Sequence, residues 1–424
     1  MIGIKVRAIG VFLLAASFIL TLSLGTVYAA ASSTGITLTV SRWAGPHADA
    51  MRDLLKEFER ETGIKVILDA IAYENLHEKQ VLELSSGTGA YDVIWVPEVW
   101  IPEYAGAGWL LPIDNMVSDP KMAGSDLDLA DFIPSILNTA KYNHKLYGFP
   151  TFVQTPLLVY RTDLFKKAGF DAPTTWDDTL KAAQYFHKNG PGGIALPAKR
   201  GAASVDVWAA FLRAAGGDYF SGGMDPQVNS NAGIAATEFW VNLGEYAPKA
   251  SAGWHWDEAA TALAQGQVAM GITMSGIASW FVDPNQTRLV GKFGFVPLPK
   301  KVSVSGTLAD WNWCISKDSK NPNAAFKLIK WLTSKDTERK LAIAAGSVGA
   351  RASFYKDAQL VGKLPWLPAM LEALKNARTQ PLIPQSSQIV DIMALALSSA
   401  YTGTLDVVKA LNQANRDIAN IVKR

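Results

Sequence analysis

The stretch from Lys145 to Arg161 reads KLYGFPTFVQTPLLVYR, and it decides how the rest of the chain is divided. Its apolar residues indicate a strand, but Pro150 and Pro156 interrupt the run. Proline has no amide hydrogen, so it belongs at strand ends, edges or bends rather than in a central strand. The pattern therefore predicts a segment that crosses between two lobes. Gln154 is the amide between the two prolines, and we expect it to face the cleft between the lobes.

The residues before this stretch alternate between strand and helix patterns. Apolar runs predict strands at 36–41, 64–70 and 92–96, and helical spacing predicts helices at 51–58 and 76–84. The third strand is nearly continuous in its apolar residues, which is typical of a sheet covered on both faces. This order predicts a parallel sheet with right-handed crossovers.

Two loops of this predicted sheet carry candidate site residues, because ligands of such sheets bind beyond the carboxyl ends of the strands. Arg42, Trp43 and His47 follow the first strand, and Glu98 and Trp100 follow the third. Tryptophan offers a flat apolar face, and a carboxylate offers acceptors to hydroxyl groups. The alternative roles are core packing for the aromatic side chains and helix capping for Glu98.

The chain after residue 161 predicts a second α/β unit. A helix is expected from Trp176, with Thr174 or Thr175 at its N-terminus. Gly306 to Ile315 is expected to return across the molecule. The other expected elements are helices at 204–215, 237–243, 257–265, 324–332, 337–345 and 405–422, and strands at 268–273 and 293–297.

The totals describe an ordinary globular protein with room for two or three domains. The chain has 424 residues, of which 49% are hydrophobic and 18% charged. Fourteen tryptophans indicate either a large core or a surface that stacks against rings. The single cysteine, Cys314, lies in an apolar run and cannot form an internal disulfide, so we expect a buried small side chain.

The first residues have the pattern of a secretory signal peptide. Lys5 and Arg7 precede an apolar stretch, 8–24, and small residues place cleavage near Ala29. The alternative is an uncleaved membrane anchor, since the stretch is nearly long enough to span a bilayer. We expect residues 1–29 to be removed and the mature protein to be soluble in the periplasm. Without Lys5 and Arg7 the basic and acidic residues balance, which argues against a nucleic-acid partner.

Motifs for cofactor, metal or covalent chemistry are absent from the sequence. It contains no glycine-rich dinucleotide or phosphate loop, no His-Glu-x-x-His, no Cys-x-x-Cys and no Gly-x-Ser-x-Gly. The five histidines are scattered without the spacing of metal ligands. We therefore expect no cofactor, no metal and no catalytic residue.

Six segments together resemble the extracellular solute-binding proteins of carbohydrate ABC transporters, the family that contains the maltose-binding protein. They cover nearly all of the expected mature chain in the family's order. The segments are KEFERETGIKV (56–66), YDVIWVPEVWIPEYAGAGWLLPID (91–114), KLYGFPTFVQTPLLVYRTDLFKKAGFDAPTTWDD (145–178), AQGQVAMGITMSG (264–276), FGFVPLPK (293–300) and SKDSKNPNAAFKLIKWLTSKD (316–336).

The resemblance implies a two-lobed periplasmic-binding-protein-like type II fold. Each lobe is expected to be a mixed, mainly parallel sheet flanked by helices, with hinge segments crossing between the lobes. The N-terminal lobe would be 32–150 plus 312–350, and the C-terminal lobe 151–311 plus 351–424. The implied function is capture of a sugar or polyol by lobe closure, followed by docking on a membrane permease. We expect a monomer that is not an enzyme.

The resemblance also extends the list of site residues. Asp310 and Trp311 lie in the expected second crossing, with Trp313 in the core; Arg351 matches a family segment near the last crossing. Further candidates are Tyr73, Trp208 and Ser275, although Trp208 fits simple packing equally well. One departure is Ala278, where the maltose-binding protein has a stacking tryptophan, which argues against a maltodextrin ligand.

Other functions stay open at this stage. A secreted carbohydrate-active enzyme also uses aromatic side chains and carboxylates in a cleft. A binding protein for iron or a polyamine is a further alternative on the same fold. If Arg42 and Arg351 both faced the cleft, an acidic sugar would fit; otherwise a neutral sugar or polyol is preferred.

Overall fold

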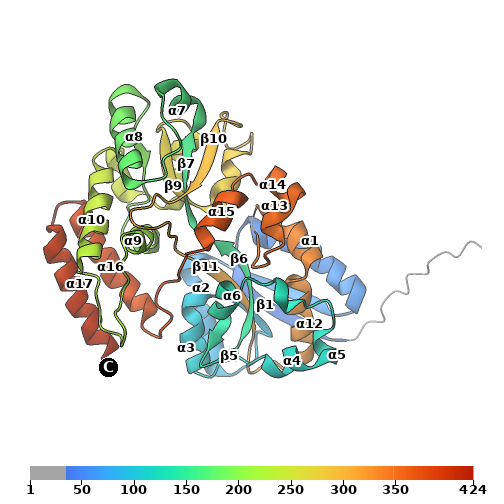
Figure 1. Ribbon diagram of the computed structural model, residues 1–424. Helices are drawn as coiled ribbons and strands as arrows, with labels where there is room; N and C mark the ends of the chain where they lie inside the picture. Colours follow the sequence, from blue (N-terminus) through green and yellow to red (C-terminus); the bar gives the residue numbers. More distant parts are fainter. Residues whose placement is uncertain (1–34, 347, 424) are drawn as a thin grey trace, which may run out of the picture.

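Residues 145–161 form strands of two different sheets in the computed structural model, which describes residues 35–346 and 348–423 (Figure 1). Strand β6 (Gly148–Gln154) belongs to one sheet and β7 (Pro156–Arg161) to the other, with Thr155 between them. β6 is an edge strand, which tolerates Pro150, and Pro156 begins β7. The predicted crossing is confirmed. The expected signal peptide lies outside the described residues.

The first sheet has the strand order β2-β1-β3-β11-β6. β1 (Thr37–Trp43) pairs in parallel with β2 (Lys65–Ile71) and β3 (Val93–Pro97). β11 (Ala309–Ile315) runs antiparallel to both β3 and β6. Four strands therefore point the same way, and β11, which returns from the second lobe, runs against them. A two-stranded sheet of β4 (Lys141–Tyr142) and β5 (Lys145–Leu146) lies outside this sheet.

The second sheet has the strand order β10-β7-β9-β8. β7 runs antiparallel to β9 (Met270–Met274) and to β10 (Phe293–Pro297), whereas β8 (Ile194–Ala195) is parallel to β9. The strand that arrives from the other lobe is again the one that runs against the rest. In both sheets the other strands therefore direct their carboxyl ends toward the region between the lobes. Both sheets are mixed, as predicted, with two antiparallel pairings in each.

The helices of the first lobe cover both faces of its sheet. Met51, Leu55 and Phe58 recur on one face of α1 and are buried, and Gly63 ends this helix in the left-handed conformation, φ 69°. The helices before the hinge and after β11 are α1 (Pro46–Thr62), α2 (Tyr73–Ser86), α3 (Ile101–Gly106), α4 (Asp114–Ser118), α5 (Pro120–Ala123), α6 (Pro134–Leu137), α12 (Pro322–Leu332) and α13 (Lys335–Ala345).

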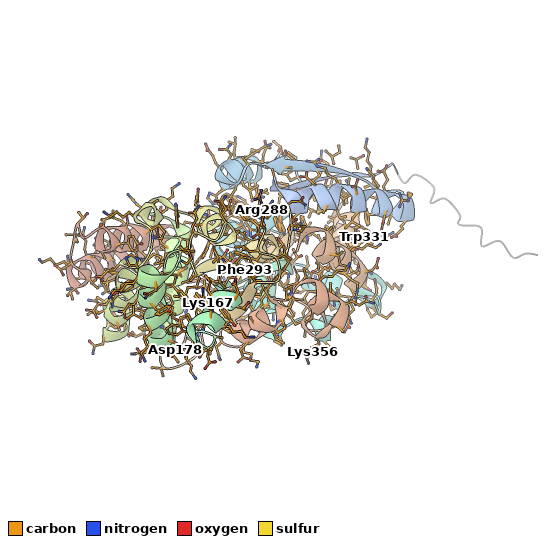
Figure 2. The ribbon with its side chains drawn as sticks, turned by 90° about the horizontal axis from the view of Figure 1, so that it is seen from above. Lys167, Asp178, Arg288, Phe293, Trp331 and Lys356 are labelled. Carbon is orange, nitrogen blue, oxygen red and sulfur yellow. The ribbon has the colours of Figure 1, made fainter. Side chains whose placement is uncertain are left out.

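The second lobe is richer in helices (Figure 1). Thr175 caps α8, because its hydroxyl accepts from the Asp178 amide and the Asp178 carboxylate accepts from the Thr175 amide. The helices are α7 (Thr162–Ala168), α8 (Trp176–Asn189), α9 (Ala202–Ala214), α10 (Asn231–Gly244), α11 (Trp256–Ala264), α16 (Ser386–Tyr401) and α17 (Val407–Val422). Seen from above, the lobes lie side by side, with Lys167 and Asp178 on the second and Trp331 on the first (Figure 2).

The C-terminal part of the chain contributes to both cores. Buried residues of α14 (Ala358–Lys363) and α15 (Leu367–Leu374) belong to the core of the first lobe, whereas those of α16 and α17 belong to the core of the second. α15 also packs against β10, between the lobes (Figure 1). The exact lobe boundaries, expected near residues 150, 311 and 350, remain a prediction. Among the described helices, none combines the length and apolarity needed to cross a bilayer.

Candidate ligand-binding site

Tryptophan and tyrosine side chains gather at the carboxyl ends of the first sheet and form what we call the aromatic wall: Trp43, Trp95, Trp100, Trp311 and Tyr73. Trp311 is central, with ring centroids 4.5 Å from Trp95, 6.1 Å from Trp100 and 6.2 Å from Tyr73. Trp43 stacks on Trp95 at 6.0 Å, with an interplanar angle of 13°. They come together because β1 and β3 end at the same edge of the sheet, where β11 begins.

The members of the wall differ in exposure. Trp95 is fully buried, and so is Trp313, which was predicted to lie in the core and stacks on Trp95 at 5.5 Å. Trp311 and Trp100 keep 8% and 9% of their surface, and Tyr73 keeps 54%. Exposure to solvent thus increases across the aromatic wall, from the buried Trp95 to the exposed Tyr73. The indole nitrogen of Trp43 is buried without a hydrogen-bond partner among the described residues.

Arg42 and His47 support this wall from behind. The Arg42 guanidinium carbon lies 4.0 Å from the Trp95 ring centroid, and its Nη1 lies 2.6 Å from Nδ1 of His47. Burial lowers the pKa of Arg42 to about 9, and it holds the pKa of His47 well below its usual range. A neutral His47 accepts the hydrogen bond from Arg42. The pair packs inside the first lobe, against the face of Trp95.

Glu98 and Asp310 form a buried carboxylate pair next to the wall. Glu98 Oε2 accepts a hydrogen bond of 3.0 Å from the Asp310 amide. The Asp310 carboxylate accepts from Thr139 Oγ1 and from Asn312 Nδ2, each at 2.7 Å. Burial raises the pKa of Asp310 to about 7, and burial together with the charge of Asp310 raises the pKa of Glu98 well above its usual range.

Asp206 and Gln380 stand on the second-lobe side, and we call these two residues the polar wall. Gln380 Nε2 donates to Asp206 Oδ1 at 2.8 Å, and Thr307 Oγ1 donates to the Asp206 carbonyl at 2.6 Å. Asp206 lies close enough to Glu98 for its charge to raise the pKa of Glu98, and burial raises the pKa of Asp206 itself to about 6. The two lobes thus present carboxylates to the same region.

The sequence predictions did not include Asp206 or Gln380. Asp206 could have been noticed, because it is the one acid in the apolar helical run ASVDVWAAF. Gln380 gives no such signal, since it follows α15 in an irregular segment.

Gln154 and Ser275 lie at the hinge. The Thr155 amide donates to Ser275 Oγ at 3.2 Å, and the Ser275 amide donates to the Thr155 carbonyl at 3.0 Å. A Cβ at Gly276 would come within 2.9 Å of the Gln154 amide carbon, so the chain at Gly276 fits closely against that side chain. These contacts join β9 to the crossing between β6 and β7.

Trp208 and Arg351 lie in the two cores instead. Trp208 is fully buried in the second core, and its indole donates to Thr237 Oγ1 at 2.8 Å. Arg351 is fully buried in the first lobe, where its guanidinium donates to the carbonyls of Thr333, Asp128 and Leu127 at 2.8–3.1 Å. Neither side chain is brought to the aromatic wall. Whether any predicted residue touches a ligand stays a prediction.

Buried polar atoms without partners occur on both sides of the hinge among the described residues. Buried polar groups are almost always hydrogen-bonded, and each exception costs about 1–3 kcal/mol. The unpaired atoms near the walls and the hinge are Trp43 Nε1, Asn312 Oδ1, Thr155 Oγ1, Thr273 Oγ1 and Gln380 Oε1.

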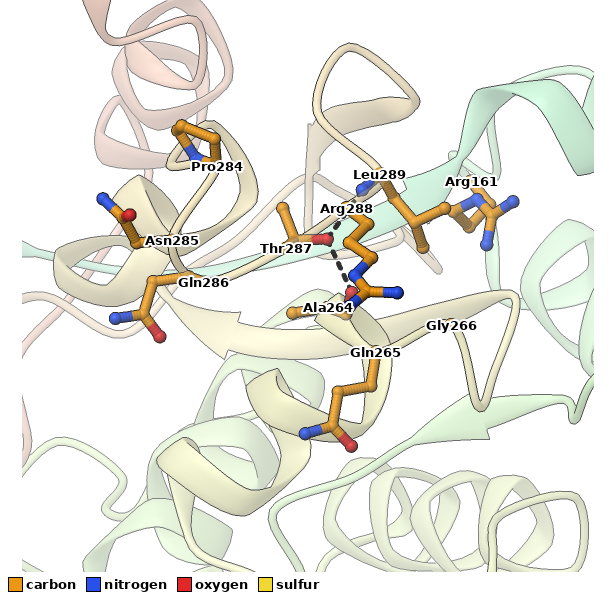
Figure 3. Close-up of a pocket in the computed structure, with 10 residues that line it drawn as sticks. All are labelled: Arg161, Ala264, Gln265, Gly266, Pro284, Asn285, Gln286, Thr287, Arg288 and Leu289. Atoms are coloured by element: carbon orange, nitrogen blue, oxygen red, sulfur yellow. Dashed lines mark hydrogen bonds between the residues drawn. The ribbon is translucent and has the colours of Figure 1, made fainter.

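A separate pocket of about 680 Å³ lies on the second lobe (Figure 3). One of its lining residues is Arg161, at the end of β7 away from the hinge, and none of the ten lining residues has an aromatic ring. Arg161 is already paired with Asp163 through bonds of 2.8 and 2.7 Å. Figure 3 shows Gln265, Asn285 and Gln286 fanning out rather than converging. This pocket lacks the stacking faces that the aromatic wall provides.

Metal binding has no support in the described part of the chain, where no group of His, Cys, Asp and Glu side chains is arranged to hold an ion. Cys314 is buried and unpaired, as expected.

The family match agrees with this architecture. Residues 44–339 match the family of bacterial extracellular solute-binding proteins. The chain belongs to this family.

Individual relatives share most of the length of this solute-binding protein. A probable amino-acid ABC transporter periplasmic-binding protein of Sinorhizobium fredii is 28% identical over 351 residues, 81% of this chain and 80% of the relative. A mannitol-binding protein of Pseudomonas aeruginosa is 24% identical over 92% of this chain and 93% of its own. A solute-binding protein of Agrobacterium radiobacter K84, solved with ribitol, has a TM-score of 0.82 and 26% identity, and the match covers 91% and 99% of the two chains.

Proposed function

We propose that this solute-binding protein captures a sugar or polyol between its lobes and delivers it to an ABC permease by lobe closure. The binding set would be the aromatic wall, the Glu98–Asp310 pair, the polar wall and Gln154 at the hinge. The protein would act in the periplasm as a monomer, without a catalytic step.

The observation that carries this proposal is the pairing of a stacking surface with acceptors across the hinge. A polyhydroxylated ligand presents C–H faces and a rim of hydroxyl donors, which require flat rings and polar acceptors respectively. Trp311 and Trp43 supply the rings, and Glu98 and Asp206 supply acceptors from opposite lobes. The mannitol-binding relative and the ribitol complex of a similar fold support this ligand class.

The charges between the walls argue against an anionic ligand. Arg42 and Arg351, the two cations considered for an acidic sugar, are both bonded inside the first lobe. Asp206, whose pKa of about 6 leaves it mostly ionised at neutral pH, would instead repel a carboxylate. The same repulsion disfavours the α-carboxylate of an ordinary amino acid, the ligand class named for the Sinorhizobium relative.

The carboxylates also do not have the relationship that glycoside hydrolysis requires. Glu98 is bonded to the Asp310 backbone, and the Asp310 carboxylate is occupied by Thr139 and Asn312. A general acid and a base or nucleophile have to flank the scissile bond with free oxygens. These contacts favour a binding role over hydrolysis.

A thermal-shift panel tests the proposal on the mature protein. Stabilisation follows from binding to the folded state alone, and at a hundredfold excess over Kd it amounts to about 2.7 kcal/mol. We expect at least one of the pentitols, hexitols or monosaccharides to raise Tm, with a Kd near 1 μM by calorimetry. Absence of stabilisation across mono-, di- and oligosaccharides and polyols would overturn the proposal, as would turnover of a bound glycoside.

A further inference from the structure

We propose that Arg213 is a positioning residue of the polar wall, because it attaches the backbone directly before Gln380 to α9. The inference rests on the proposed function for the place of the ligand, and it adds a residue that acts on the ligand without touching it. Three observations carry it: which carbonyls Arg213 binds, where their segment lies, and how this cation is buried.

The guanidinium of Arg213 binds two successive carbonyls. Its Nη1 donates to the Arg378 carbonyl at 2.6 Å, and its Nη2 donates to the Thr379 carbonyl. Gln380 follows directly, and its Nε2 donates to Asp206 Oδ1 at 2.8 Å. Asp206 and Arg213 both lie on α9, two helical turns apart. One helix therefore holds this segment twice, through its backbone and through the side chain of Gln380.

The segment that Arg213 binds is a crossing between the lobes. Residues 375–385 connect α15, which packs in the first core, to α16, which packs in the second. The Arg378 carbonyl also accepts from the Leu308 amide at 3.0 Å, and the Arg378 amide donates to the Gly306 carbonyl at 3.2 Å. Leu308 immediately precedes β11. A single carbonyl thus joins α9 to two segments that pass between the lobes.

Arg351 is a useful contrast, because it also is a buried arginine that donates to backbone carbonyls. All three of its acceptors lie within the first lobe, so its contacts only hold that lobe together. The acceptors of Arg213 lie between the lobes, one and two residues before Gln380. Arg213 is only 7% exposed and both of its Nη atoms are engaged, so its effect on a ligand has to pass through Gln380.

The way in which Arg213 is buried points to a requirement for geometry. Its ion pair with Asp218 spans 3.6 Å, and its Nε has no hydrogen-bond partner among the described residues. Burying a charge without close neutralisation is costly, and an apolar side chain of similar volume is often equally stable or more stable in such a place. The rigid fork of arginine donors, however, holds two carbonyls in one fixed arrangement. That arrangement sets the position of Gln380.

Hydrogen exchange of the ligand-free protein tests the attachment itself. Arg213→Met removes both hydrogen bonds to the segment, so we expect the amides of residues 376–383 to exchange about tenfold faster. Exchange that stays unchanged in this segment would overturn the inference, whatever the ligand of the protein.

A double-mutant cycle tests the effect on binding. Kd is measured by calorimetry for the members of the sugar and polyol panel that bind the parent, at pH 8, where Asp206, with a pKa of about 6, is ionised. We expect Arg213→Met and Gln380→Ala each to weaken binding by about fivefold to tenfold, the range of one hydrogen bond. The double variant should lose no more than Gln380→Ala alone, because Arg213 acts through Gln380.

Two further variants keep this test decisive. Arg213→Gln retains one amide group for one carbonyl, so we expect a loss of about threefold in a fold closer to the parent. Arg161→Met is the matched control, because Arg161 is an arginine of the same lobe that is 8% exposed and paired with Asp163 away from the hinge. It should lower Tm and leave both Kd and the exchange of residues 376–383 unchanged.

The outcomes separate this inference from the proposed function. Unchanged affinity in Arg213→Met and Arg213→Gln would overturn the inference and leave the proposed function standing. Independent, multiplying losses in the cycle would do the same, as would an equal loss in Arg161→Met. A parent protein that binds no member of the panel would overturn the proposed function, and with it the binding role of Arg213.

Discussion

The aromatic wall and the polar wall are built in opposite ways. The aromatic wall lies at strand ends of the first sheet, with Arg42 and His47 packed behind it. The polar wall consists of a carboxylate on a helix and an amide from an irregular segment, held by bonds of 2.8 and 2.6 Å. One wall is fixed by packing, and under the proposed function it would recognise the shape of the ligand. The other depends on a few polar contacts and would recognise hydrogen-bonding groups. We therefore propose that a ligand docks first on the first lobe and that closure then adds the second.

Removing the centre of the aromatic wall should have the largest effect. Trp311→Ala removes the ring that contacts Trp95, Trp100 and Tyr73 at the centre of the wall, so the stacking surface loses its support and we expect affinity to fall by about a hundredfold. Trp311→Phe, which keeps a ring, should lose about tenfold. Calorimetry on variants whose circular dichroism matches the parent provides the measurement.

Trp208→Phe is the matched control, since Trp208 is a buried tryptophan of the second core. It should lower Tm and leave Kd unchanged. If Trp208→Phe weakened binding as strongly as Trp311→Phe, the aromatic wall would lose its special role.

A smaller effect is expected from the polar wall. Asp206→Asn removes a charged acceptor that is reached on closure, and we expect roughly a tenfold loss of affinity for whichever ligand the panel identifies. Because closure follows docking, most of the loss should appear in the dissociation rate. Stopped-flow fluorescence separates the rates, and a loss confined to the association rate would contradict the proposed order of the two walls.

Gln154→Leu tests the hinge between the walls. The amide of Gln154 lies against Gly276, and leucine keeps a similar volume without the polar head. We expect affinity to fall by about threefold to tenfold, the range of one neutral hydrogen bond, with Tm unchanged. Unchanged affinity would show that the Gln154 amide does not contact the ligand.

The smallest expected effect is a pH dependence of stability that comes from Asp310. Its pKa is about 7 in the folded protein, against an ordinary value of 3.8, so between these values the folded state binds a proton that the unfolded state releases. The contribution of Asp310 to stability is therefore greatest at low pH and decreases as pH rises toward 7.

Relative to Asp310→Asn, the parent Tm should fall by about 2–4 °C between pH 5 and 7.5, the shift that corresponds to about 1 kcal/mol in a domain of 150–250 residues. Comparison of the two proteins cancels His47, whose lowered pKa acts in the opposite direction, and the remaining difference reports Asp310 together with Glu98, whose pKa the charge of Asp310 raises. Parallel Tm profiles would show that Asp310 does not titrate in this range.

The sequence predicted the elements whose signals are local. Thr175 with Asp178 forms a cap within one turn, Gly63 ends a helix by its own conformation, and the prolines at 150 and 156 constrain the strands that contain them. α16 was missed, because its almost continuous apolar run hides the helical period that an exposed face would reveal.

The candidate site was predictable on one side only. Trp43, Glu98 and Trp311 sit at strand ends, where topology places a ligand. The pairing of Asp206 with Gln380 joins residues 174 positions apart, and that of Glu98 with Asp310 joins residues 212 apart. Such contacts depend on how segments far apart in the sequence pack within each lobe, and no local pattern predicts them. Arg351 was expected at the cleft, but its guanidinium donates hydrogen bonds to backbone carbonyls inside the first lobe.

The position of β11 has a consequence for the order in which the chain folds. β11 lies between β3 and β6 in the first sheet, yet it follows every strand of the second sheet in sequence. During synthesis, which begins at the N-terminus, β6 therefore lacks its neighbouring strand β11 until residues 309–315 have been made. The second sheet, whose strands all lie between residues 156 and 297, is complete before then. The lobe that begins the sequence is the one whose sheet has to be finished last.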